Sequence, residues 1–191
     1  MDSIILIGPR GSGKTSVGKE ISLIMDDIKF IDADEEFIRL HGPIKDIVDK
    51  KGWPEFRRLE SALLINICKN NEKYKIVLAV GGGAVAHNQG EEYRARNVTT
   101  LKEFGNIFYL LPYKDLNQSA RMLTERINKD PFSKKGRPQL KDCKSPFEEM
   151  LLTLKERHPI YSDPNVRDWI IYTKNNTPYQ IAKVIRDEIL L

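Results

Sequence analysis

The chain has 191 residues, of which 40% are hydrophobic and 30% charged, and its formal net charge is +4 at pH 7. This composition is typical of a folded protein, and the length suits one α/β domain spanning residues 1–191. No apolar run approaches the roughly 20 residues that a membrane-spanning helix needs, and the positive charge is too modest for a nucleic-acid interface. The short, acidic start does not resemble a signal peptide, so we expect a cytoplasmic protein without nucleic-acid or membrane partners.

Five short apolar runs alternate with longer amphipathic stretches, a pattern typical of βαβ units. The strands are expected at residues 3–8, 28–32, 75–80, 106–111 and 168–172. All but the second are nearly continuous apolar runs, as in parallel strands that are covered on both faces. The sequence therefore predicts a three-layer α/β fold with a parallel sheet between helices.

Seven helices fit between and after these strands. They are expected at residues 14–25, 34–41, 53–70, 90–104, 114–126, 146–161 and from 178 to the C-terminus. The last helix has Thr177 as its N-cap and an apolar face formed by Ile181, Val184, Ile185 and Ile189. The segment that begins at residue 127 is rich in Lys, Pro and Gly, which favours a mobile surface loop.

A phosphate-binding motif, GPRGSGKT, occupies residues 8–15 between the first strand and the first helix. It matches GxxxxGK[ST], in which glycines let backbone N–H groups turn toward phosphates and the helix adds its positive end. We expect Lys14 to reach the β- and γ-phosphates and the Thr15 hydroxyl to complete a Mg²⁺ site. GTPases, ATPases and small-molecule kinases share this loop, so it does not identify the acceptor.

Two carboxylates, Asp32 and Asp34, follow the second strand. In open α/β sheets, ligands bind outside the carboxyl ends of the strands. We expect one carboxylate to lie near the metal and the other to accept a hydrogen bond from a substrate hydroxyl. The alternative is a solvated strand end that caps the next helix.

Three consecutive glycines, Gly81, Gly82 and Gly83, follow the third strand. Their backbone N–H groups are not covered by side chains, so a ligand with hydroxyls or a carboxylate can approach closely. The alternative is a flexible turn.

The segment GWPEFRRLE is expected on the helix between these two motifs. Arg57 and Glu60 share a helix face, so Glu60 can hold the Arg57 guanidinium as a bidentate clamp for a carboxylate. Arg58 points about 100° away, and we expect it to pair with Glu55 at the surface. The alternative, which this segment by itself favours, is two solvated arginines on a helix face.

Other conspicuous side chains are interpreted as structural. Trp53 and Phe56 are expected to pack this helix beside the substrate pocket rather than to stack on a cofactor. His41, His87 and His158 lack the spacing of metal ligands.

Together, GPRGSGKT, FIDADEEFI, GWPEFRRLE, VGGGA, GRPQL and ERHPIY occur in the order and approximate spacing of the shikimate kinase family. The chain resembles this family from Ile4 to the C-terminal helix. The resemblance implies the P-loop NTPase fold of nucleoside monophosphate kinases, with strand order 2-3-1-4-5, a substrate-binding region at about 33–62 and a lid at about 127–141. It also implies a monomer that uses ATP and Mg²⁺ to phosphorylate the 3-hydroxyl of shikimate, in the pathway to chorismate and aromatic amino acids.

The resemblance assigns a role to each site residue. Nucleotide binding is expected of Gly11, Ser12, Gly13, Lys14, Thr15, Ser16, Arg126 and Arg137, with Arg126 stacked on the adenine. Shikimate binding is expected of Asp34, Arg57, Gly81, Gly82, Gly83 and Arg157, with the two arginines on its carboxylate. The expected catalytic residues are Lys14, Asp34 as base, and Arg137 in the lid. The expected metal site comprises Thr15 and Asp32.

The lid departs from the family pattern in two ways. Gln139 replaces a leucine of the usual RPLL, and the interval from Arg126 to Arg137 is a few residues longer than usual. Lys134 or Lys135 could therefore share the lid arginine's role.

Two alternatives remain open. A related small-molecule kinase, such as a gluconate kinase, would share the phosphate loop and the lid but take an uncharged or differently shaped acceptor. A non-catalytic nucleotide- or metabolite-binding module would keep the fold, and the unusual lid is its only support. Arg57 and Arg157 favour an acceptor that carries a carboxylate.

Overall fold

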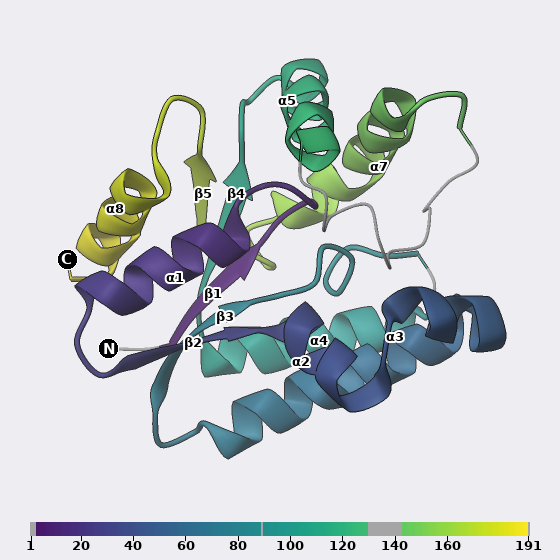
Figure 1. Cartoon of the computed structure of the whole chain (residues 1–191). Coiled ribbons are helices and arrows are strands. Elements are labelled where there is room, and N and C mark those ends of the chain that lie inside the picture. The colour runs from purple at the N-terminus through teal and green to yellow at the C-terminus, as the bar shows by residue number, and fades with distance from the viewer. Residues whose placement is uncertain (1–2, 89, 130–142, 191) are drawn as a thin grey trace.

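A parallel sheet of five strands forms the centre of the computed structural model, which describes residues 3–88, 90–129 and 143–190 (Figure 1). The strands are β1 (Ser3–Ile7), β2 (Ile28–Asp32), β3 (Lys75–Ala79), β4 (Gly105–Leu111) and β5 (Trp169–Tyr172). Their order is β2-β3-β1-β4-β5, and every neighbouring pair is parallel. The predicted sheet and its strand order are therefore confirmed.

The helices lie close to their predicted positions. They are α1 (Lys14–Ile24), α2 (Ala33–His41), α3 (Ile44–Asn70), α4 (Glu91–Phe104), α5 (Leu116–Lys129), α7 (Pro146–Tyr161) and α8 (Pro178–Leu190). The Thr177 hydroxyl accepts a hydrogen bond from the Gln180 N–H (3.3 Å), which confirms it as the cap of α8. Ile181 and Ile185 are buried, but Val184 is 46% exposed, so its predicted place on the apolar face was wrong.

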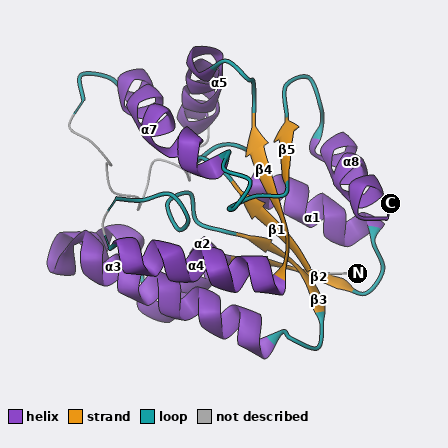
Figure 2. Cartoon of the chain, turned by 180° about the vertical axis from the view of Figure 1, so that it is seen from behind, coloured by secondary structure: helices purple, strands orange, loops and turns teal. Residues whose placement is uncertain are grey.

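Alternating strand side chains form two cores, one on each face of the sheet. One core joins Ile4 and Leu6 of β1 to α1 and α8, while the other joins Ile5 and Ile7 to α3, α4, α5 and α7. Figures 1 and 2 show α1 and α8 together on one side of the sheet and α3 and α4 on the other. Burial on both faces explains why these strands read as continuous apolar runs.

Helix α3 contains one non-helical residue, Gly52 (φ 80°, ψ 170°), so it comprises two helical segments that meet at a kink. The segment after the kink agrees with the helix predicted from residue 53, whereas the segment from Ile44 to the kink was not predicted. Gly52 and the nearby Pro54 are helix breakers, which is why the sequence indicated a boundary there. The kink redirects the chain just before Phe56 and Arg57, and thereby sets the angle at which they enter the site.

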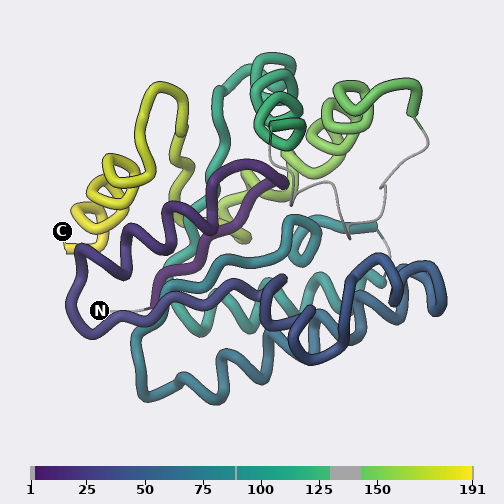
Figure 3. Tube along the Cα trace, in the orientation of Figure 1, coloured from purple at the N-terminus to yellow at the C-terminus, as the bar shows by residue number. Residues whose placement is uncertain are grey.

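The segments that follow β1, β2 and β3 meet at one edge of the sheet (Figure 3). This follows from parallel pairing, because the carboxyl ends of neighbouring strands then lie side by side. None of the helices in the described part of the chain combines the length and the apolar sequence that a bilayer crossing requires.

Candidate functional site

The phosphate-binding loop arches from the end of β1 to the start of α1. Gly8, Gly11 and Gly13 have φ values of 140°, 78° and 95°, which side-chain-bearing residues rarely adopt, so the predicted need for glycine is confirmed. The Lys14 ammonium lies across its own loop and donates hydrogen bonds to the carbonyl oxygens of Gly8 (2.9 Å) and Pro9 (3.1 Å). The backbone of the loop and the Lys14 ammonium therefore lie together at the start of α1.

Asp32 connects this loop to α2. Its Oδ2 accepts a hydrogen bond from the Thr15 hydroxyl (2.6 Å), and its Oδ1 accepts from the backbone N–H groups of Asp34 (3.0 Å) and Glu35 (3.3 Å). Asp32 is thus the N-cap of α2, as the alternative interpretation expected, and also the partner of Thr15. Its expected place near a metal remains a prediction. The two expected metal ligands lie together, and both offer the hard oxygen atoms that Mg²⁺ prefers.

Arg57 and Glu60 form a buried ion pair on α3. Arg57 Nη1 donates to Glu60 Oε2 at 2.5 Å, and the two side chains are only 3% and 8% exposed. The predicted pairing is confirmed, as is the surface pair in which Arg58 Nε donates to Glu55 (2.8 Å). A buried arginine held in this way offers its remaining N–H groups in a fixed direction.

Aromatic rings complete the surroundings of this arginine. The Arg57 Cζ atom lies 4.8 Å from the ring centre of Phe56 and 5.2 Å from that of Trp53. Trp53 and Phe56 are also in edge contact, with ring centres 5.8 Å apart. Both rings pack the helix and line the cavity beside Arg57, as predicted.

The glycine run after β3 creates space for side chains as well as for ligands. A Cβ atom at Gly83 would lie 2.4 Å from Arg57 Nη2, and one at Gly81 would lie 2.7 Å from Asp34 Oδ1 and 2.8 Å from Glu60 Oε1. These distances are far inside van der Waals contact, so any larger residue would displace the charged groups. The sequence suggested exposed backbone N–H groups, whereas the structure shows a packing reason for these two glycines.

Helix α7 contacts the same glycine run from the other side. The Arg157 Nη1 (3.0 Å) and the Tyr161 hydroxyl both donate hydrogen bonds to the Gly82 carbonyl. Tyr161 is fully buried and stacks on Tyr109 of β4 with ring centres 4.9 Å apart. Tyr161 belongs to the ERHPIY motif but was not singled out from the sequence, because a buried tyrosine looks like an ordinary core residue.

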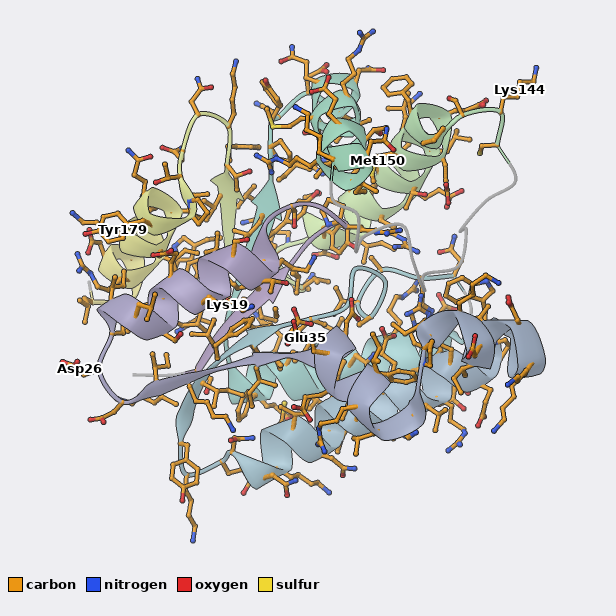
Figure 4. All side chains as sticks on the ribbon, viewed as in Figure 1. Lys19, Asp26, Glu35, Lys144, Met150 and Tyr179 are labelled. Atoms are coloured by element: carbon orange, nitrogen blue, oxygen red, sulfur yellow. The ribbon has the colours of Figure 1, made fainter. Side chains whose placement is uncertain are left out.

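Two cavities meet at this site. The first, of about 830 Å³, is lined by the phosphate-binding loop together with Asp32, Asp34 and Arg126. The second, of about 450 Å³, is lined by Asp34, Arg57, Arg157, Gly82 and Gly83. In Figure 4, the labelled Glu35 of α2 belongs to the wall of the first cavity and Met150 of α7 to that of the second. Asp34 lines both, so it lies at their boundary.

Burial controls the ionisation of the groups around the second cavity. Burial raises the pKa of the Glu60 carboxyl, and the negative charge of Asp34 raises it further. The positive charges of Arg57 and Arg157 lower it. Burial likewise raises the pKa of the Tyr161 hydroxyl, while Arg157 lowers it. Glu60 therefore depends on its arginine neighbours to remain a carboxylate.

The lid predictions fall mainly outside the described residues. Arg137, Lys134, Lys135 and Gln139 all lie in the segment 130–142, which the structure does not describe. Arg126, at the end of α5, lines the first cavity and donates a hydrogen bond to the Gly11 carbonyl (3.3 Å). Its expected contact with an adenine ring remains a prediction.

The sheet order, the phosphate-binding loop at the end of β1 and the adjoining second cavity together define a P-loop kinase acting on a small molecule. The family model described as "Shikimate kinase" matches residues 10–190. The chain belongs to the shikimate kinase family, whose members are ATP-dependent kinases.

Individual relatives agree with this assignment over most of their length. The chain is 34% identical over 189 residues to the shikimate kinase of Wigglesworthia glossinidia brevipalpis, an alignment that covers 98% of this chain and 94% of the relative. It is 34% identical over 162 residues to shikimate kinase 2 of Yersinia enterocolitica, covering 84% and 82%. Among solved structures, shikimate kinase from Acinetobacter baumannii in complex with shikimate superposes with a TM-score of 0.80 at 30% identity, covering 100% and 93%.

Proposed function

We propose that this chain transfers the γ-phosphoryl group of ATP to the 3-hydroxyl of shikimate, producing shikimate 3-phosphate and ADP. The observation that carries the proposal is the pair of cavities that meet at Asp34. One is lined by the phosphate-binding loop, and the other is lined by Arg57 and Arg157 among other residues. A donor in the first cavity and an acceptor in the second would be in contact at that carboxylate.

The first cavity suits ATP. Its loop presents backbone N–H groups and Lys14 to the phosphates, and Arg126 lies on its wall for contact with the base. The Thr15 hydroxyl and the Asp32 carboxylate, 2.6 Å apart, would hold Mg²⁺ directly or through water. Bound there, Mg²⁺ would neutralise charge on the β- and γ-phosphates.

The second cavity suits a small ring that carries a carboxylate and hydroxyls. Arg57 is fixed by Glu60 and two aromatic rings, and Arg157 approaches from α7, so two cations converge from different helices. Buried arginines favour a carboxylate, which they bind in a bidentate manner. The glycine loop provides a flat wall against which a ring can lie.

Asp34 is positioned to be the general base. It would accept the proton of the acceptor hydroxyl as the oxygen of that hydroxyl bonds to the γ-phosphorus and the bond from phosphorus to the β-phosphate oxygen breaks. Capping by Asp32 fixes the first turn of α2, and Asp34 Oδ1 lies against Gly81. The carboxylate is therefore held in place before substrates bind, which lowers the cost of orienting them.

The remaining parts of the proposal concern the whole enzyme. We propose a monomer, as the family resemblance implies, with ATP and shikimate as its partners. We propose the cytoplasm as its compartment, because ATP is its phosphoryl donor. Arg137 in the lid remains a predicted catalytic residue.

A panel of acceptors tests this function. ADP release should be measured with ATP and Mg²⁺ in the presence of shikimate, gluconate or no acceptor. We expect release that depends on shikimate. Turnover with gluconate alone would establish the related sugar-acid kinase instead, and binding of ATP without any turnover would establish a non-catalytic module.

A further inference from the structure

Arg10 occupies a position in the phosphate-binding loop that the motif leaves open. The motif assigns it no role, because any residue satisfies GxxxxGK[ST] there. In the structure, Arg10 lines both cavities, and its Nε and Nη2 atoms are buried. Of the described cationic residues, it alone belongs to both cavity walls.

The backbone at Arg10 is held between the loops of the two cavities. The Ser12 N–H donates to the Pro9 carbonyl (3.3 Å), which closes a turn around Arg10. A Cβ atom at Gly82 would lie 3.4 Å from the Arg10 nitrogen, so the phosphate-binding loop and the glycine run are in close contact there. Arg157 and Tyr161 donate to the Gly82 carbonyl, so the backbone of Arg10 lies close to a fixed part of the acceptor side.

Four other cations of the described cavity walls each lie on one side of the boundary. On the acceptor side, Arg57 pairs with Glu60 and Arg157 donates to Gly82. On the nucleotide side, Lys14 and Arg126 donate to carbonyls of the phosphate-binding loop. Arg10 is therefore the described positive charge placed where the two cavities join.

Asp34 is the acidic counterpart of Arg10. It is the one described carboxylate that lines both cavities, and it faces the expected position of the acceptor hydroxyl. The phosphoryl group must cross the boundary that these two side chains share. In a loose transition state, negative charge spreads over its three equatorial oxygens, and an arginine can donate two parallel hydrogen bonds to them.

We propose that Arg10 is a catalytic residue that binds the phosphoryl group as it crosses between the cavities and then binds the phosphate of the product. This inference rests on the proposed function. The hydroxyl proton passes to Asp34, ADP leaves, and Arg10 remains protonated throughout, so it contributes positive charge and hydrogen bonds alone.

The test compares Arg10→Met and Arg10→Lys with the wild-type protein. Arg58→Met is the matched control, because Arg58 is an exposed arginine that pairs with Glu55 outside both cavities. For each protein, kcat and both KM values should be measured with ATP, Mg²⁺ and shikimate. Calorimetry in the presence of ADP should then give the Kd of shikimate and the Kd of shikimate 3-phosphate.

We expect Arg10→Met to lower kcat by about 100- to 1,000-fold while both KM values stay within a few-fold of wild type. Its Kd for shikimate 3-phosphate should rise by about tenfold or more, with little change for shikimate. Arg10→Lys should show smaller changes of the same kind, and Arg58→Met should behave as wild type. If circular dichroism shows that Arg10→Met is unfolded, the proposal is judged from Arg10→Lys. The ratio of its Kd for shikimate 3-phosphate to its Kd for shikimate should then exceed that of the wild-type protein.

Three outcomes would overturn the proposal. An unchanged kcat would remove Arg10 from catalysis. Equal loss of affinity for shikimate and its phosphate would make Arg10 a ligand of the acceptor carboxylate, and a raised ATP KM with normal kcat would make it a ligand of the nucleotide. If the wild-type protein does not use shikimate, the proposed function fails, and the same variants are judged with the acceptor that supports turnover.

Discussion

Replacing Arg57 by methionine separates the two contributions that this arginine makes. Methionine keeps a long apolar stem between Trp53 and Phe56 but removes the guanidinium. It should therefore weaken acceptor binding and, independently, destabilise the fold by leaving Glu60 buried without its cation. We expect both effects, with ATP binding unchanged.

The size of each effect follows from burial. With side chains only 3% and 8% exposed, Arg57 and Glu60 form a buried pair, and removal of one partner costs about 3–5 kcal/mol of stability. For the acceptor, losing a charged group that contacts it costs about 2–5 kcal/mol, or an increase in KM of about 30- to 4,000-fold. Because burial already raises the pKa of Glu60 above its ordinary value of 4.5, the stability deficit should grow as pH rises above that value.

A double variant distinguishes the two effects. In Arg57→Met/Glu60→Met, no unpaired charge is left in the core, so most of the lost stability should return while the shikimate KM stays high. Urea unfolding gives the stability of each protein, steady-state kinetics gives the KM, and calorimetry gives the ATP affinity. Arg58→Met, which breaks only an exposed pair, serves as the control.

Two results would contradict the proposal that Arg57 binds the acceptor. An unchanged shikimate KM in the single variant would show that Arg57 does not contact the acceptor. A double variant that recovers its acceptor affinity along with its stability would show that the kinetic effect came from local unfolding.

Three further predictions address the rest of the site. Gly83→Ala would place a Cβ atom 2.4 Å from Arg57 Nη2, and since a displacement of about 1 Å costs about 100-fold, kcat/KM for shikimate should fall by that order; normal kinetics would contradict this. Thr15→Val removes the hydroxyl that donates to Asp32, so half-maximal rate should require more Mg²⁺, and an unaltered Mg²⁺ titration would exclude Thr15 as a ligand. Burial lowers the pKa of His158 from 6.5, so the unfolded chain binds its proton more readily and the free energy of unfolding should fall as pH drops through 6.5. His158→Asn should flatten that dependence in urea unfolding at about pH 7.5 and about pH 5.5, and parallel slopes for both proteins would disprove it.

The sheet and its helices were predictable because their signals are local. Buried parallel strands leave continuous apolar runs, and most turns between elements contain Gly, Pro or Asn. The part of α3 before the kink was missed because Gly52 and Pro54 interrupt the pattern, although the chain is helical on both sides of the kink. Val184 was misplaced because a helical pattern does not show how far a neighbouring layer extends.

The site was predictable only where it follows a motif or a helical spacing. The pair of Arg57 and Glu60 is three residues apart, so its contact could be inferred. The reason for Gly83 could not, because its close neighbour Arg57 comes from another element of the fold. Arg10 likewise carries no signal in the sequence, since its importance arises from two cavities that meet only in three dimensions.

The most direct test of the account is to identify the product. The wild-type protein should be incubated with ATP, Mg²⁺ and shikimate, and the mixture analysed by phosphorus and proton NMR. We expect ADP and one new phosphate ester, on the 3-hydroxyl of shikimate, in equal amounts. ADP accompanied by inorganic phosphate, or a phosphate on another hydroxyl, would contradict the claim that the two cavities bring ATP and the 3-hydroxyl together at Asp34.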